Sequence, residues 1–102
     1  MPPVVTVFRS RLRDEHDGYE ETAVEMESAA RAVPGFVDFK TFAAADGERV
    51  SIVVFDSWES HGAWRDDPRH RAAQRRGRAD WYREYLIQVC DLADEHRFSG
   101  CD

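Results

Sequence analysis

The sequence of 102 residues has little cysteine and no long apolar run. Its two cysteines are Cys90, in an apolar stretch, and Cys101, near the C-terminus, and they do not make a disulfide framework. The first residues, MPPVVTVFRSRL, lack the cationic start and apolar core of a signal peptide. No stretch approaches the length of a membrane span. We therefore expect a cytoplasmic protein with no membrane partner.

Positive charge is also scarce, because 14 Lys and Arg stand against 20 Asp and Glu, a formal net charge of −6. Nucleic acid needs a basic field, so no nucleic-acid partner is expected. Acids crowd residues 14–27, which hold no base, and arginines crowd residues 65–78. This pattern favours two solvated helix faces of complementary charge. The alternative is that some of the arginines meet an anionic ligand.

Motifs of the familiar catalytic classes are missing, since the chain has no GxSxG, Walker A loop, HExxH or CxxC. The histidines are not spaced as a metal site; they are His16, His61, His70 and His96. We expect no metal ion.

What is present suits one small packed domain, with 42% hydrophobic and 12% aromatic residues. We expect a single domain over 1–102, with its core at about 4–98 and a C-terminal tail at 99–102.

The first half of the chain predicts a strand, a helix and two further strands. Residues 4–12 are rich in β-branched and aromatic side chains, which favours a strand. Residues 17–33 carry an apolar residue every three or four positions, which predicts a helix with one buried stripe: Tyr19, Ala23, Met26, Ala30 and Val33. Strands are expected over 36–44 and 50–55, joined by a hairpin at Asp46-Gly47.

The second half predicts two helices and a last strand. Ser57 is a candidate N-cap for a helix over 58–66. Asp67 as cap and Pro68 at the first helical position begin a second helix, which is expected to run to about Tyr82. Its inner stripe is His70, Ala73, Gln74, Gly77 and Trp81, while its arginines point elsewhere. Residues 85–92 predict the fourth strand.

This order of elements is the split βαβ pattern of ferredoxin-like folds. The fold class is α+β, with a four-stranded antiparallel sheet and helices on one face. We assign Phe8, Phe42 and many Val and Ile residues to the other face. That face is too apolar to remain exposed to solvent. A second copy packed sheet to sheet would cover it, so a homodimer is expected.

Several segments together resemble the antibiotic biosynthesis monooxygenase family. They are VVTVFRSRL, PGFVDFKTF, DGERVSIVVFDSWESHGAWRDDPRH, AAQRRGR and WYREYLIQVC, and they span roughly residues 4–98. The resemblance implies a dimeric α+β barrel with a pocket between sheet and helices. Some members oxygenate aromatic polyketide intermediates, such as anthrones and hydroquinones, with O2 and without a metal or tightly bound cofactor. Some use reduced flavin as a cosubstrate, and others degrade haem or act on aldehydes or quinones.

The haem-degrading pattern matches this chain in part. Trp64 matches the helix Trp of that group, but Gln74 stands where its iron-ligating His would be. Ser10 stands where that group has an Asn. His70, one turn before Gln74, is a conceivable shifted ligand. A haem-binding or haem-degrading protein is therefore an alternative, as is a non-catalytic ligand-binding dimer.

The oxygenase pattern matches better and makes Trp64 and His70 the catalytic candidates. His70 stands where a related member has a tyrosine, and Ser60 where it has an Asn. A histidine that titrates near neutral pH can serve as the base for a phenol or hydroquinone. The expected substrate-binding residues are Phe8, Trp58 and Tyr82 around the ring, and Ser10 and Gln74 as donors to its oxygens. Ser60 and His61 are further expected substrate-binding residues. Trp81 and Tyr85 are expected in the core.

Overall fold

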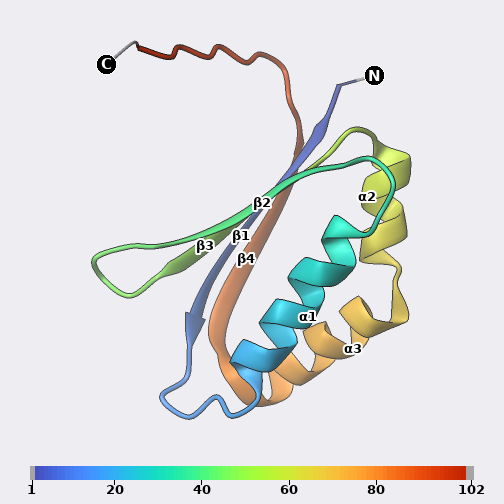
Figure 1. The fold of residues 1–102 in the computed structure, drawn as a ribbon. Helices are drawn as coiled ribbons and strands as arrows, with labels where there is room; N and C mark the ends of the chain where they lie inside the picture. The colour runs from blue at the N-terminus through green and yellow to red at the C-terminus, as the bar shows by residue number, and fades with distance from the viewer. Residues whose placement is uncertain (1, 101–102) are drawn as a thin grey trace.

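Four strands form one antiparallel sheet, and the helices cover one of its faces (Figure 1). The computed structural model describes residues 2–100. The elements are β1 (Val4–Leu12), α1 (Tyr19–Arg31), β2 (Phe36–Ala43), β3 (Arg49–Phe55), α2 (Trp58–Arg65), α3 (Pro68–Arg76), a π-helical turn (Gly77–Trp81) and β4 (Tyr82–Asp91). The strand order is β2-β3-β1-β4, which confirms the α+β ferredoxin-like fold.

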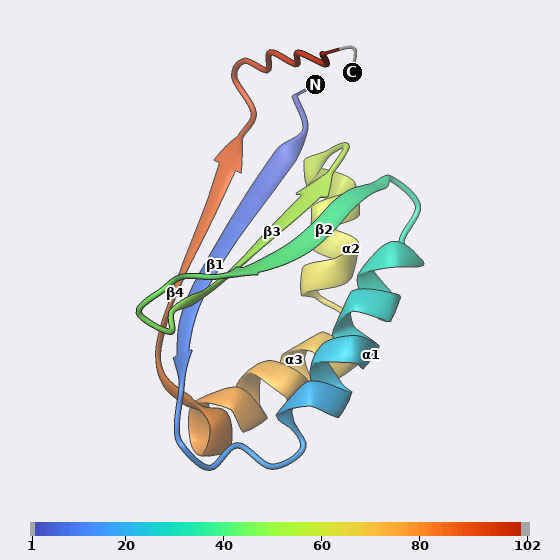
Figure 2. The same ribbon diagram turned by 60° about the vertical axis from the view of Figure 1, so that its left-hand side comes forward.

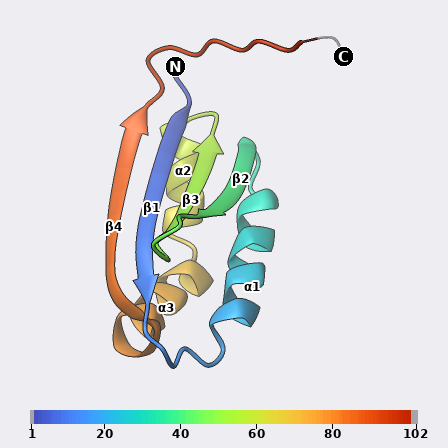
Figure 3. The same ribbon diagram turned by 90° about the vertical axis from the view of Figure 1, so that its left-hand side faces the viewer.

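The strands lie side by side in the order β4, β1, β3, β2 (Figure 3). Their register decides which side chains face the helices. Thr6 of β1 lies between Val53 of β3 and Val89 of β4. Phe8, two residues on, shares its face, because side chains alternate along a strand. The assignment of Phe8 to the outer face was therefore wrong. Phe42 does lie on the outer face, where its side chain is 46% exposed.

The hydrophobic core lies between α1, α2 and the C-terminal half of β3. Ala30, Val53, Phe55 and Trp64 form one buried cluster, and Val33 packs at its margin. The predicted stripe of α1 therefore faces the sheet, as its spacing indicated. The α1 helix itself is shorter than expected.

The second helix region departs from the sequence prediction. The α-helix ends at Arg76, the chain makes a π-helical turn, and Tyr82 begins β4 rather than ending a helix. Two features hold this turn. A Cβ atom on Gly77 would collide with the Tyr82 ring, so glycine permits the close approach. The guanidinium of Arg13 donates to the carbonyl oxygens of Ala79 (2.9 Å) and Tyr82 (3.1 Å).

The predicted starts of α2 and α3 and the hairpin are confirmed. The Ser57 hydroxyl accepts a hydrogen bond from the Ser60 amide, and the Asp67 carboxylate accepts one from the Arg69 amide. The β2–β3 hairpin is tied to β1 by Arg11, whose guanidinium is paired with Asp46 at 2.8 Å.

Beyond β4, residues 92–100 form neither helix nor strand and leave the sheet on the side of the N-terminus (Figure 2). The Phe98 side chain there is 83% exposed. Cys101 lies outside the described residues. Within residues 2–100, no helix combines the length and the hydropathy needed to cross a membrane.

Candidate active site

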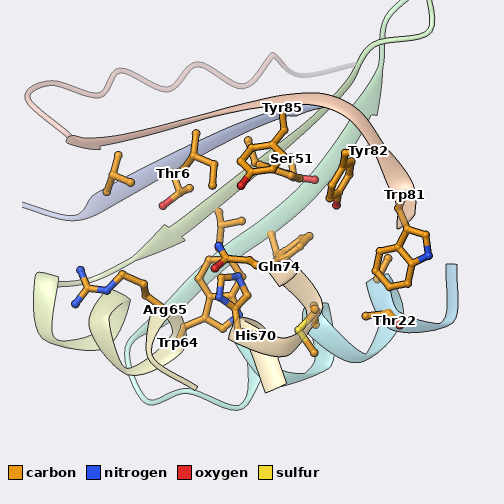
Figure 4. A pocket seen from close by; sticks show the side chains of 18 of the residues that line it. Thr6, Thr22, Ser51, Trp64, Arg65, His70, Gln74, Trp81, Tyr82 and Tyr85 are labelled. Atoms are coloured by element: carbon orange, nitrogen blue, oxygen red, sulfur yellow. The ribbon is translucent and has the colours of Figure 1, made fainter. Parts of the chain in front are cut away.

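A cavity of about 350 Å³ lies between the sheet and the helices (Figure 4). Side chains from every strand and from all three α-helices line it, and aromatic rings make up much of its wall. Six of the nine predicted site residues line it: Phe8, His61, Trp64, His70, Gln74 and Tyr82. The cavity therefore brings together most of what the sequence singled out.

Trp64 and His70 lie against one another in this cavity. Their ring centroids are 4.3 Å apart, with 41° between the planes. The corner between α2 and α3, built by the Asp67 cap and Pro68, folds the second helix back so that both rings reach one space. Trp64 is 8% exposed and also packs on Phe55, with centroids 5.6 Å apart, so its ring serves the core as well as the site.

The cavity wall carries buried polar atoms that lack a hydrogen-bond partner within the described chain. They are Thr6 Oγ1, His61 Nδ1, Trp64 Nε1 and His70 Nδ1. Leaving such a group unsatisfied costs about 1–3 kcal/mol, so a set of them around one cavity indicates a place for a polar ligand or water. Sequence reasoning missed Thr6. The available signal was a lone hydroxyl among the valines of VVTVF, on the same face as Phe8.

Both histidines of the cavity have lowered pKa values. Burial lowers the pKa of His70, while the backbone of Arg65 and the Asp67 carboxylate act in the opposite direction. Burial also lowers the pKa of His61, helped by the nearby Arg65 guanidinium. At neutral pH both imidazoles are therefore uncharged and able to accept a proton.

Tyrosine rings close the end of the cavity near the π-helical turn. The Tyr82 ring meets Phe8 edge-on at 5.5 Å and lies 5.6 Å from Tyr85. Burial raises the pKa of the Tyr82 phenol, so it stays protonated and can donate a hydrogen bond. Tyr85 lines the cavity rather than the core. Trp81 is buried as expected but also lines the cavity, and its Nε1 donates to the Asp17 carbonyl at 2.8 Å.

Three predicted site residues do not line this cavity. Ser10 is buried near the C-terminal end of β1, where it pairs with Tyr85 of β4, but it does not line the cavity. Trp58 lies at the start of α2, and its Nε1 donates to the Asp91 carboxylate at 2.8 Å. The Ser60 hydroxyl donates to the Asp56 carboxylate at 2.8 Å, so it secures the first turn of α2.

The residues present do not fit a haem site. Gln74, and not a histidine, lines the cavity at the family's ligand position, and Ser10 is absent from the wall. His70, the shifted candidate, has the Trp64 ring against it. Within residues 2–100, no group of three or more His, Cys, Asp or Glu side chains is placed to hold a metal ion.

Known proteins resemble this chain in sequence. The sequence pattern of the family described as "Antibiotic biosynthesis monooxygenase" matches residues 3–76. The "Uncharacterized protein YqjZ" of Bacillus subtilis (strain 168) is 35% identical over 98 residues, which cover 95% of this chain and 86% of YqjZ.

Solved structures share the fold at lower sequence identity. Rv0793 from Mycobacterium tuberculosis superposes with a TM-score of 0.80 at 22% identity, covering 93% of this chain and 99% of Rv0793. SnoaB from Streptomyces nogalater, a cofactor-independent oxygenase, superposes with a TM-score of 0.76 at 15% identity, covering 93% of this chain and 97% of SnoaB.

Proposed function

This chain belongs to the antibiotic biosynthesis monooxygenase family, and from that premise we propose that it oxygenates a flat aromatic substrate with O2. The proposed substrate class is an anthrone or hydroquinone of the polyketide type. The reaction needs no metal and no tightly bound cofactor, and reduced flavin remains a candidate cosubstrate. The likeness to SnoaB supports the reaction type, while the substrate class comes from the family resemblance.

One observation carries the proposal: an aromatic cavity whose wall holds polar atoms with no hydrogen-bond partner among residues 2–100, beside a neutral imidazole. Aromatic walls bind a flat ring, and the unmet hydrogen-bonding atoms select a ring that carries oxygen substituents. The Trp64 indole and the Thr6 hydroxyl offer hydrogens to such oxygens. Gln74, which lines the same space, offers an amide.

The chemistry follows from removal of one substrate proton. His70 accepts the proton from a ring hydroxyl or from the acidic CH2 of an anthrone. The resulting electron-rich anion reduces O2 and forms a carbon–oxygen bond to it, which gives a hydroperoxide after reprotonation. Loss of water from that hydroperoxide leaves a quinone, so one oxygen atom enters the product and the other leaves as water. Donors around the cavity stabilise the developing oxyanion.

A homodimer closed through the outer face of the sheet completes the proposal. This face carries an apolar group of side chains: Val5, Val7, Phe42, Val50, Ile52, Val54 and Leu86. Charged pairs such as Arg9 with Glu48 lie at the hairpin end of the same face. Burying so much apolar surface against a second copy removes it from water.

Oxygen uptake with a tricyclic anthrone or hydroquinone tests the proposed function. Without flavin we expect one O2 consumed per quinone formed, unchanged by a chelator. A separate arm with reduced flavin is corrected for the O2 that reduced flavin consumes without substrate. Loss of activity on chelation would contradict the metal-free reaction. A haemin titration that gives a stoichiometric Soret shift would favour the haem alternative. Ring binding without any oxygen uptake across the substrate series would favour a non-catalytic binding protein.

A further inference from the structure

A second hollow, of about 320 Å³, adjoins the cavity at the corner between α2 and α3. We call it the arginine cleft, and its lining residues are Arg65, Asp66, Arg71, Gln74, Arg75 and Arg78. Arg65 and Gln74 also line the cavity, so the two hollows share a wall. A second link is the Arg78 guanidinium, which donates to the hydroxyl of Tyr85, a cavity residue, at 3.3 Å.

The charge of the arginine cleft is not neutralised by its surroundings. Its single carboxylate, Asp66, is shared between Arg65 at 3.2 Å and Arg71 at 3.0 Å. Arg75 and Arg78 have no carboxylate partner within residues 2–100, although the chain as a whole has a net charge of −6.

The acidic face of α1 does not supply the missing partners. In the described part of the chain, no ion pair joins α1 to α3, and Glu27 of α1 is paired with Arg31 of its own helix. The link from this arginine-rich region towards α1 is a hydrogen bond from Arg76 to the Asp17 carbonyl at 3.4 Å. Asp67 and, through space, Glu25 of α1 raise the pKa of Arg69 of α3, so the two helix faces are complementary in charge. No acid of α1, however, forms an ion pair with Arg75 or Arg78 within residues 2–100.

We propose that the arginine cleft binds the carboxylate or phosphate group of a ligand whose ring occupies the cavity. Guanidinium groups match planar carboxylate and phosphate oxygens with paired donors. Because Arg65 and Gln74 line both hollows, the edge of a ring in the cavity would lie close to the arginine cleft. This inference rests on the proposed function, because it assumes a ring in the cavity. The anionic group can belong to an acidic aromatic substrate or to the phosphate of a reduced flavin mononucleotide.

Calorimetric titration with two matched pairs tests the cleft. One pair is anthraquinone-2-carboxylate with its neutral hydroxymethyl analogue, and the other is flavin mononucleotide with riboflavin. We expect the anionic member of at least one pair to bind about 10-fold more tightly, with a preference that shrinks as salt is raised. The pair that shows the preference identifies the source of the anion.

Variants of Arg75 test whether the cleft is responsible. Arg75 lines the cleft but not the cavity, so Arg75→Gln and Arg75→Glu should leave the affinity of the neutral analogue unchanged. We expect the preference for the anion to fall about 3-fold with Gln and about 10-fold with Glu. The control is Arg83, which lines neither hollow; the same two substitutions there change the net charge equally and should leave the preference intact.

Equal affinity for the anionic and neutral members of both pairs overturns the cleft proposal. A preference that survives Arg75→Glu, or that falls equally with Arg83→Glu, also overturns it. In each case, binding of the neutral ring leaves the proposed function standing. If neither member of either pair binds, the ring site itself fails, and the proposed function and the cleft fail together.

Discussion

His70 and His61 tie the stability of the site to pH. Burial lowers both pKa values below the ordinary 6.5 of histidine. Between the lowered pKa and 6.5, the unfolded chain binds protons that the folded chain does not. The free energy of unfolding should therefore have its full value above pH 6.5 and decrease as the pH falls from 6.5 towards the lowered pKa values.

Urea unfolding at pH values on either side of 6.5 measures this effect. We expect His70→Gln to reduce the pH dependence, because glutamine has no proton to bind. His96→Gln, in the segment after β4, is the matched control. A wild-type protein equally stable on both sides of pH 6.5 would contradict the burial of neutral imidazoles.

Trp64 has two roles that different substitutions separate. Trp64→Ala should cost about 3–5 kcal/mol of stability, because the ring packs on Phe55 in the core. Trp64→Phe keeps a ring and removes an Nε1 donor that has no partner in the described chain, so stability should change less. If Nε1 binds a ligand oxygen, Trp64→Phe weakens binding of an oxygenated ring about 10-fold. Equal calorimetric affinity of wild type and Trp64→Phe would rule out that donor role.

At the scale of single residues, the sequence correctly predicted side chains whose position depends on residues close to them in the chain. Trp64 and His70 meet because of the Asp67-Pro68 corner between them, and that corner is visible in the sequence. Ser60 was assigned to the site because of its position in the family resemblance. In the structure its hydroxyl donates to Asp56 instead. Thr6 was missed because its role depends on which sheet face the helices cover.

Among the elements, the π-helical turn determines where Tyr82 lies. Its last carbonyl groups are bound by Arg13, whose amide also donates to the Trp81 carbonyl at 2.7 Å. We expect Arg13→Gln to lower the midpoint of thermal unfolding by roughly 5 °C and to speed amide exchange in this turn. Arg83→Gln is the matched control on β4. Unchanged exchange in the turn would show that Arg13 does not hold it.

This π-helical turn is an element that the sequence did not predict. The stripe from His70 to Trp81 continues at helical spacing, so the pattern gave no sign of a change in winding. The change depends on Arg13, more than sixty residues earlier in the chain, and on the contact between Gly77 and the Tyr82 ring. β1, the helix caps and the hairpin were predictable because their signals lie within a few residues.

For the whole molecule, the outer face of the sheet is the proposed dimer interface. Val54 of β3 faces that side, since its neighbours Val53 and Phe55 face the core. Val54→Asp should convert the dimer to monomer, because an unpaired charge would be buried in the interface. Sedimentation velocity at micromolar concentration measures this. Val24→Asp, at an exposed position on α1, is the control that should remain dimeric. A wild-type monomer, or an intact Val54→Asp dimer, would exclude this interface.

Quinone formation by wild type, His70→Ala and His96→Ala, measured across pH, tests the claim that His70 is the base in an aromatic oxygenation. We expect His70→Ala to lose roughly 10²–10⁴-fold in turnover and His96→Ala to match the wild type. The wild-type rate should fall on acidification with an apparent pKa below 6.5, since the neutral imidazole is the working form. Normal turnover in His70→Ala, with the same pH profile, would contradict the claim.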